Sequence, residues 1–295
     1  MANQLKPLKG IRIVSLALNL PGPAALMRCR AMGATCIKVE PLAAGGGDPM
    51  KAYNPTAYAQ MHAGVRTLAF DLKTSQGQAR LGLVLDKADV LLTSFRPSAL
   101  KRLGLDWPQL HKRHPQLWQV AIVGATGHGG AAAEVAGHDL TYLAEQGLVT
   151  GLDLPASLFA DMTGSLLAVE VILGAALQAK MTAKPRQIWV SLSDAAKYAA
   201  LPRRWGLTAP SGAVGGAHAG YQIYKCKDGR AAVAALEPHF AKNLCALADL
   251  ELTGFAAMMQ SKMKADLKRW FAKQTCAVLD ALAEQHDLPI YTLKP

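Results

Sequence analysis

Short apolar runs alternate with helix-length segments through the first 200 residues of the chain. The runs that have the length and content of buried strands are residues 11–16, 35–39, 68–72, 89–95, 117–123 and 188–192. The segments with helical length are residues 22–32, 74–87 and 162–180. Strands separated by helices indicate βαβ units and a parallel sheet, so the pattern predicts an α/β fold.

Individual residues at the predicted helix ends support this fold prediction. Gly33 follows the first helical segment, where a glycine with positive φ ends a helix, and Thr74 stands where it can cap the next one. No GxGxxG sequence follows the first strand, so a nicotinamide dinucleotide is not indicated. We therefore predict a Rossmann-like parallel-sheet domain over residues 1–201, without that fingerprint and with its ligand at the carboxyl ends of the strands.

The pattern changes after residue 201. Residues 202–219 are rich in Gly, Pro and Ala, which predicts a linker. Beyond them, two strand-like runs flank Lys227-Asp228-Gly229, a tripeptide typical of a hairpin turn, and three helical segments follow. Residues 220–295 are therefore expected to form a second, smaller α+β domain.

Composition narrows the class of ligand. Hydrophobic residues make up 51% of the chain, which excludes a disordered protein. The net charge of +11 predicts an anionic partner. Because the basic residues are scattered and only 6% of residues are aromatic, the pattern does not favour nucleic acid. A phosphate-bearing small molecule is the preferred interpretation, and a charge that serves only solubility is the alternative.

The cysteines and the apolar runs of the sequence indicate the cellular compartment in which the protein is expected. The five cysteines are an odd number without CxxC spacing, which argues for a reducing compartment and against a disulfide scaffold or a zinc site. The first ten residues lack the apolar core of a signal peptide. Residues 166–179 are interrupted by Glu170 and are too short to span a bilayer. We therefore expect a cytoplasmic protein without a membrane segment or a bound metal.

One carboxylate stands at a predicted helix N-terminus. Asp161 lies where a loop meets the long helix that begins near residue 162, and unpaired amides with the helix dipole would stabilise its charge. An ordinary N-cap is the alternative interpretation. Gly164, one turn later, would let a ligand approach the backbone closely.

Two other residues are candidates for acid–base chemistry. His138 follows Gly137, a little after a Gly-rich loop at a strand end, where an imidazole could carry a proton at neutral pH; a structural histidine is the alternative. Glu237 ends an apolar strand and precedes Pro238, which also fits an acidic residue at a helix N-terminus. Each signal alone is weak.

Basic side chains near strand ends could contact phosphates or stay solvated. They are Lys38, Lys73, Arg96 and Arg102. Serine nucleophile elbows, HExxH sequences and P-loops are absent from the sequence. The residues by themselves therefore indicate an α/β enzyme that acts on an anionic ligand, and no more specific activity.

The chain resembles the family III CoA-transferases of the CaiB/BaiF type, which include the α-methylacyl-CoA racemases. In the first half, the resemblance rests on LKGIRIVSL, PGPAALMRCRAMGATCIKVE, GDPM, GVRTLAFDLKTSQGQ and ADVLLTSFRPSALKRLGLDW. It continues with AGHDLTYLAEQGL, ADMTGSLLAVEVILGAALQ and YQIYKCKDGRAAVAALEPHF. The ordered series covers nearly the whole chain and is specific, although each motif alone is not.

The resemblance implies roles for three residues. The family's catalytic carboxylate matches Asp161, and the histidine of GHD and the glutamate of EPxF match His138 and Glu237. In the racemases these groups exchange the α-proton of an acyl-CoA, the glutamate supporting the histidine, and in the transferases the aspartate attacks the thioester. Because all three are present, a 2-methylacyl-CoA racemase is favoured, with an acyl-CoA:carboxylate CoA-transferase as the alternative.

The same resemblance implies a CoA site and a homodimer. The implied contacts are Asn19, Leu20, Pro21, Lys73, Ser94, Phe95, Arg96 and Arg102. Many relatives have an arginine at the place of Pro41, which implies that one phosphate or adenine contact is absent here. The chain also departs from the family pattern at Val65 (usually lysine), Ser98 (usually glycine) and His128 (usually proline). Relatives also continue beyond LPIYTLKP, which leaves open whether the dimer is interlocked. A shortened, non-catalytic scaffold that binds CoA or another partner is a third interpretation.

Overall fold

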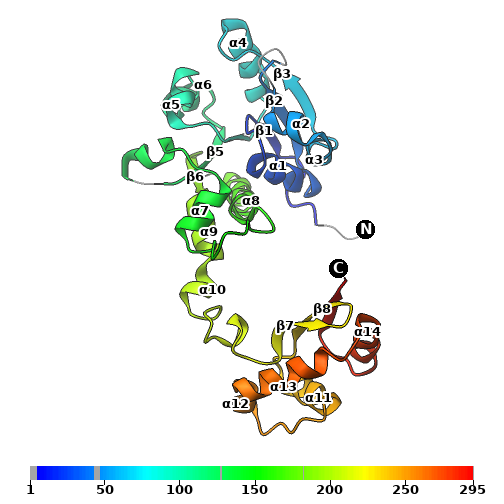
Figure 1. The fold of residues 1–295 in the computed structure, drawn as a ribbon. Coiled ribbons are helices and arrows are strands. Elements are labelled where there is room, and N and C mark those ends of the chain that lie inside the picture. The colour runs from blue at the N-terminus through cyan, green and yellow to red at the C-terminus, as the bar shows by residue number, and fades with distance from the viewer. Residues whose placement is uncertain (1–4, 43–46, 127, 182, 295) are drawn as a thin grey trace. The chain divides into compact units, whose positions relative to one another are not determined.

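The chain divides into two units, Met1–Ala200 and Leu201–Pro295, and each is described by itself (Figure 1). The structure is a computed structural model that describes residues 5–42, 47–126, 128–181 and 183–294. Most of the predicted Gly-rich loop at residues 43–48 lies outside these ranges. The predicted linker at residues 202–219 falls inside the second unit. Its first residues belong to helix α10 (Leu201–Arg204), and it also contains a 3-10 turn, η3 (Ala213–Gly215).

A six-stranded, fully parallel sheet forms the first unit, in the order β3-β2-β1-β4-β5-β6. Its strands are β1 (Arg12–Ser15), β2 (Thr35–Glu40), β3 (Arg66–Ala69), β4 (Val90–Thr93), β5 (Trp118–Val123) and β6 (Gln187–Ser191). The chain runs outward from β1 to β3, then returns to build β4–β6 on the other side of β1. This order confirms the predicted Rossmann-like sheet and places its switch point between β1 and β4.

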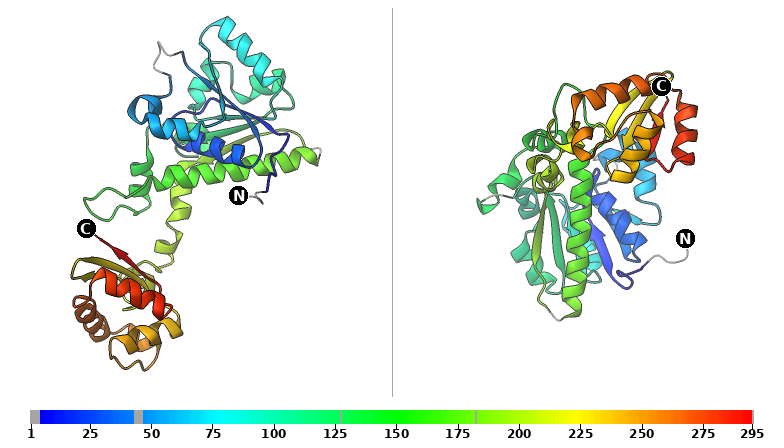
Figure 2. Two further views of the ribbon diagram at one scale, coloured as in Figure 1. Left: turned by 90° about the vertical axis from the view of Figure 1, so that its right-hand side faces the viewer. Right: turned by 90° about the horizontal axis from the view of Figure 1, so that it is seen from below.

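Helices cover both faces of this sheet (Figure 2). One face carries α1 (Pro21–Ala31), α7 (Asp139–Glu145), α8 (Phe159–Lys180) and α9 (Leu192–Ala199), and the other carries α4 (Ser75–Leu85), α5 (Pro97–Arg102) and α6 (Trp107–Arg113). Neighbouring strand residues point to opposite faces: Ile13 and Leu92 pack with α1 and α8, whereas Val14 and Leu91 pack with α4–α6. Short helices α2 (Pro49–Tyr53) and α3 (Pro55–Met61) and the 3-10 helix η2 (His128–Glu134) complete the unit.

Local sequence signals account for several element ends. Gly33 takes φ +96° after α1, and the Thr74 side chain accepts a hydrogen bond from the Gly77 amide at 3.0 Å, as predicted for both. Strand β3 ends at Ala69, earlier than the predicted residues 68–72. The reason is a turn at Asp71, whose carbonyl accepts from the Thr74 hydroxyl at 2.8 Å.

Helix α8 is longer than the apolar run that the sequence outlined. Among the described residues, it is the one helix whose length and composition alone would suffice to cross a membrane. Of its most apolar stretch, 44% is buried, and the helix packs against α1, α9, β5 and β6. Its apolar surface therefore covers one face of the sheet.

The second unit is an antiparallel sheet packed against helices, which confirms the predicted smaller α+β fold. Its sheet has the order β7-β8-β9, and the helices described in this unit, apart from α10, lie between β8 and β9 in the chain. The elements are β7 (Tyr221–Cys226), β8 (Gly229–Ala234), α11 (Pro238–Leu247), α12 (Phe255–Met258), α13 (Ser261–Phe271), α14 (Cys276–Gln285) and β9 (Ile290–Leu293). The predicted hairpin joins β7 and β8. Strand β9 was not predicted, since it is short and its residues pair with residues 57 to 63 positions earlier in the chain.

Gly22 in α1 and Gly82 in α4 differ in the space available for a side chain. Replacing each of them by alanine therefore tests the packing of α1. A Cβ added at Gly22 would lie 2.1 Å from the Ala17 Cβ, whereas one added at Gly82 meets nothing within 4 Å. We expect Gly22→Ala to lower the free energy of unfolding by about 1–3 kcal/mol. Gly82→Ala should raise it by up to about 1 kcal/mol. Urea denaturation checks both, and equal effects would contradict the packing.

Candidate active site

A cavity of about 240 Å³ opens at the carboxyl ends of β1, β4 and β5. Its walls include residues 18–19 after β1, residues 94–96 after β4 and Gly124 after β5. Parallel α/β sheets bind ligands at this edge, in the crevice beside the switch point. The position of the cavity therefore agrees with the ligand site expected from the strand pattern.

Two hydrogen bonds hold the loop after β1. The Leu18 amide donates to Ser94 Oγ at 3.1 Å, and the Asn19 amide donates to Asp48 Oδ1 at 3.1 Å. Asn19 has φ +64°, a left-handed conformation that asparagine tolerates better than most residues. Leu18 and Asn19 therefore line the cavity in a conformation set by side chains from other loops.

Asp161 lines the same cavity from the first turn of α8. Because Leu158 is the N-cap, the ordinary-cap interpretation of Asp161 is wrong. Burial, and then the charge of Asp139, raise the pKa of the Asp161 carboxyl from 3.8 to about 6. A carboxyl with this pKa can both take up and release a proton near neutral pH.

The His138-Asp139 pair presents two functional groups in different directions. His138 is exposed, lines the cavity and stands at the N-cap position of α7, where its amide donates to Thr141 Oγ1 at 3.0 Å. Asp139 is buried and accepts a hydrogen bond from the Asp161 amide at 2.9 Å. The sequence indicated His138 as a functional residue but not Asp139, although Asp139 directly follows that histidine.

Tyr142 is a further wall residue that sequence reasoning missed. Its ring is 8% exposed, and burial together with the Asp161 charge raises the pKa of its hydroxyl. A Cβ at Gly124 would lie 2.3 Å from this oxygen, and a Cβ at Gly137 2.5 Å from it. Both glycines therefore make room for the Tyr142 hydroxyl near Asp161.

Two predictions about ligand contact are wrong. A Cβ at Gly164 would lie 2.4 Å from Leu192 Cδ2, so this glycine lets α8 approach α9 rather than a ligand. Lys38 has no exposed surface, and its ammonium group pairs with Asp48, so it cannot reach a phosphate. Alternation along β2 turns Lys38 inward, which its position near a strand end did not reveal.

The predicted CoA contacts fall into two groups. Asn19, Pro21, Ser94, Phe95 and Arg96 line the cavity. The predicted contacts outside its lining are Leu20, Lys73 and Arg102.

Each of these three residues has a defined place in the first unit. Leu20 packs on the small cluster that contains Met50 and Met61. Lys73 is exposed beyond β3, and Arg102 is exposed at the last residue of α5. Lys73 and Arg102 thus remain candidates for the more distant phosphates of a long ligand.

Glu237 occupies the N-cap position of α11 in the second unit. Its side chain is exposed, as expected for an acidic residue at a helix start. Its approach to His138 stays a prediction.

Comparisons with known proteins identify the family. The model of CoA-transferase family III matches residues 8–295. The chain belongs to this family. A crystal structure of a CaiB/BaiF family protein from Brucella suis has a TM-score of 0.79 at 25% identity, covering 99% of this chain and 84% of that one. A hypothetical protein from Mycobacterium tuberculosis, 24% identical, shares the fold with a TM-score of 0.82, covering 99% and 86%.

The family members that resemble this chain include proteins named as racemases and proteins named as CoA-transferases. An alpha-methylacyl-CoA racemase from Mus musculus is 30% identical over 92% of this chain and 75% of the racemase. A succinate–glutarate CoA-transferase from Agrobacterium fabrum is 31% identical over 66% of this chain and 53% of the transferase. This family III chain spans about half the length of the first curated relatives that it matches.

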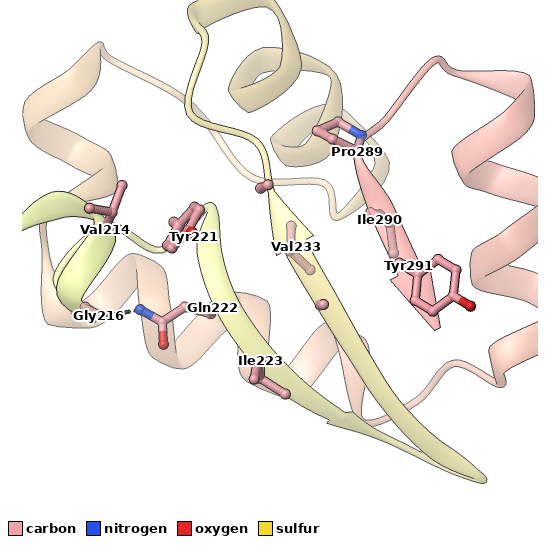
Figure 3. A pocket seen from close by; sticks show the side chains of 11 residues that line it. Val214, Gly216, Tyr221, Gln222, Ile223, Val233, Pro289, Ile290 and Tyr291 are labelled. Carbon is pink, nitrogen blue, oxygen red and sulfur yellow. Dashed lines mark hydrogen bonds between the residues drawn. The ribbon is translucent and has the colours of Figure 1, made fainter. Parts of the chain in front are cut away.

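A larger hollow of about 810 Å³ lies on the sheet face of the second unit (Figure 3). Tyr221, Ile223, Val233 and Tyr291 contribute to an apolar lining, and the Gln222 side chain donates to the Gly216 carbonyl. Among the residues that the structure describes, the lining of this hollow contains no carboxylate, histidine or lysine. The ionisable groups of this lining are the hydroxyls of Tyr221 and Tyr291, whereas the smaller cavity holds a carboxyl and an imidazole, so the cavity around Asp161 is the candidate active site of this family III chain.

Two clusters of metal-ligating groups occur among the described residues, and neither includes Asp161 or His138. In the first, Glu40, Asp48 and His62 surround the Lys38 ammonium, which occupies the place of a cation. In the second, Cys226 and Cys276 have Sγ atoms 3.5 Å apart near Asp228. All five cysteines are free and buried. The tertiary fold brings these cysteines together across 50 residues, which spacing rules could not show.

Asp139→Asn isolates the effect of charge on Asp161. The asparagine side chain keeps an oxygen that can accept the hydrogen bond from the Asp161 backbone N–H. It lacks the negative charge that raises the Asp161 pKa. We expect the Asp161 pKa to fall below about 6 and to stay above 3.8, because burial is the larger cause. Titration of ¹³C-labelled aspartate by NMR measures it. An unchanged Asp161 pKa would contradict the assigned coupling, and Asp194→Asn, at the start of α9, is the control.

Proposed function

We propose that this chain acts on CoA thioesters and racemises a 2-methylacyl-CoA by removing and returning its α-proton. The supporting observation is that His138 and Asp161 line one cavity at the switch point, where the Asp161 pKa is about 6. A thioester α-proton is weakly acidic, so its removal needs a base on one face of the carbon and a proton donor on the other. An imidazole and a carboxyl with a raised pKa suit these two roles.

The two residues exchange roles for the two enantiomers. With one enantiomer, the Asp161 carboxylate takes the α-proton, the electron pair moves into the enolate, and the His138 imidazolium returns a proton to the opposite face. With the other enantiomer, neutral His138 takes the proton and the Asp161 carboxylic acid returns one. The Asp161 amide already donates to Asp139, so donors for the enolate oxygen must come from other groups.

The rest of the site follows the same proposal. Glu237 would accept a hydrogen bond from His138 and fix its tautomer. Arg96, on the cavity wall, and the exposed Lys73 and Arg102 would contact the CoA phosphates. We further propose a cytoplasmic homodimer, with the substrate as its small-molecule partner.

A CoA-transferase is the second candidate, because a relative with that name has 31% identity, against 30% for the racemase, although over 66% rather than 92% of this chain. In this reaction the Asp161 carboxylate attacks the thioester carbonyl, the C–S bond breaks, and CoA leaves as the thiolate while a mixed anhydride remains on Asp161. The thiolate then attacks the Asp161 carbonyl of the anhydride, which releases the donor carboxylate and leaves a CoA thioester on Asp161. The acceptor carboxylate attacks this thioester and forms a second anhydride as the C–S bond breaks. The thiolate finally takes the acceptor acyl group, and the Asp161 carboxylate is restored. His138 has no required role in this chemistry.

Solvent-deuterium exchange at the α-carbon of (S)-2-methylacyl-CoA, followed by NMR, separates the candidates. Exchange without an acceptor acid that disappears in Asp161→Ala and in His138→Ala supports racemisation. Absent exchange with retained CoA binding contradicts it for this substrate, and trapping of an acyl adduct on Asp161 then supports transfer. Failure to bind CoA would favour the non-catalytic scaffold.

A further inference from the structure

Lys38 is completely buried in the first unit, yet every donor of its ammonium group has a partner. It forms an ion pair with Asp48, lies 2.9 Å from His62 Nε2 and lies 3.2 Å from Glu40 Oε1. An ammonium group has three N–H donors, and three acceptors surround it here. Because a buried ammonium group without partners would be very costly, this arrangement requires all three neighbours.

The neighbours of Lys38 are arranged to accept from it. Burial, and then the Lys38 charge, lower the pKa of His62, so its ring is neutral at pH 7. His62 Nδ1 lies 2.7 Å from the Tyr58 carbonyl and donates to it, which leaves Nε2 to accept from Lys38. The Tyr58 hydroxyl donates to Glu40 at 2.7 Å. The cluster is therefore a closed network with one orientation.

Asp48 connects this network to the candidate active site. Its Oδ2 atom pairs with Lys38, and its Oδ1 atom accepts from the Asn19 amide at 3.1 Å and from the Met50 amide at 3.0 Å. Asn19 lines the cavity that contains Asp161 and holds φ +64°. A non-glycine residue in this conformation needs an external contact to keep it there.

We propose that Lys38 and Asp48 are positioning residues of the candidate active site, because their buried ion pair orients the carboxylate that holds Asn19 in its left-handed conformation. The inference rests on the proposed function for the use of that site. Removing the ammonium group leaves Glu40 and Asp48 as two buried carboxylates side by side. Without its cationic partner the Asp48 side chain turns away from Glu40, and the Asn19 backbone loses the acceptor that keeps this wall in place.

Lys38→Met tests the positioning by removing the charge at similar volume. The matched control is Gln119→Met, which removes another fully buried polar side chain, hydrogen-bonded to Leu105 and Gln187, outside the cavity lining. Residue-resolved amide exchange, well below the melting temperature of each variant, should show Asn19 exchanging at least tenfold faster in Lys38→Met only. An Asn19 rate equal to that of the wild type overturns the proposal.

Asp48→Asn provides a second variant if Lys38→Met folds poorly. The asparagine keeps the shape of Asp48 but not its charge. The Asn19 amide should therefore exchange faster than in the wild type by a similar factor. With 2-methylacyl-CoA, either variant should lower kcat/KM at least tenfold while Gln119→Met does not. If the wild-type chain turns over no CoA thioester, the proposed function fails, and the exchange of the Asn19 amide still decides the positioning role.

Discussion

Replacement of Asp161 by asparagine is expected to lower the rate of α-proton exchange by at least about 10³-fold, because the side chain can no longer take up or release a proton. The amide has nearly the same shape, so CoA affinity should change little. NMR exchange rates and calorimetric titration with CoA measure the two quantities. Asp194→Asn, in the first turn of α9, is the matched control and should keep full activity.

The same variant is expected to stabilise the fold at pH 7. The folded-state pKa of Asp161 is about 6, above the ordinary value of 3.8, so the ionised carboxylate destabilises the folded chain. The penalty is absent below pH 3.8, grows as the pH rises to about 6, and amounts to about 2–3 kcal/mol above that. Urea denaturation should therefore show Asp161→Asn more stable at pH 7 and nearly equal to the wild type at pH 3.5. A variant less stable at both pH values would contradict the raised pKa.

Phe271→Ala is expected to lower the free energy of unfolding of the second unit by about 3–5 kcal/mol. Its ring has no exposed surface, stacks on Tyr224 with centroids 4.6 Å apart and meets Trp270 edge-on at 4.9 Å. Truncation leaves a cavity between β7 and α13 that neighbouring side chains cannot fill. Chemical denaturation followed by the NMR signal of the Trp270 indole, one of five tryptophans in the chain, measures the loss.

Amide exchange gives the spatial extent of this effect. If the two units unfold separately, Phe271→Ala should accelerate exchange in residues 201–295 and leave the β1 and β4 amides unchanged. Tyr291→Ala is the control, since that ring is 73% exposed and its loss should cost less than about 1 kcal/mol. Equal acceleration in both units would show that they unfold together.

Much of the fold could be predicted because its signals are local. The apolar runs at β1, β2, β4, β5 and β6 mark strands whose two faces are both buried, and Thr74 and Gly33 mark helix ends. Strand β9 and the short helices α2 and α3 escaped prediction. Few residues define each of them, and β9 depends on pairing with β8.

The candidate site was only partly predictable for a related reason. Asp161 and His138 both stand at helix starts, His138 directly after Gly137 and Asp161 three residues before Gly164, so the local sequence singles them out. Asp139 and Tyr142 matter because the fold turns them toward Asp161, and no local pattern encodes that direction. Lys38 looked like a free cation near a strand end, and its burial depends on Asp48, Glu40 and His62 from other segments.

The sequence by itself therefore determined the α/β class, the parallel sheet, the family and the carboxylate at the start of α8, since periodicity and motif order are properties of the linear chain. Only the tertiary structure decided which of these side chains share a cavity, why the Asp161 pKa is raised, and which lysine is buried. Those properties depend on distances and burial between segments far apart in the sequence, and Coulomb and desolvation energies are set by that geometry.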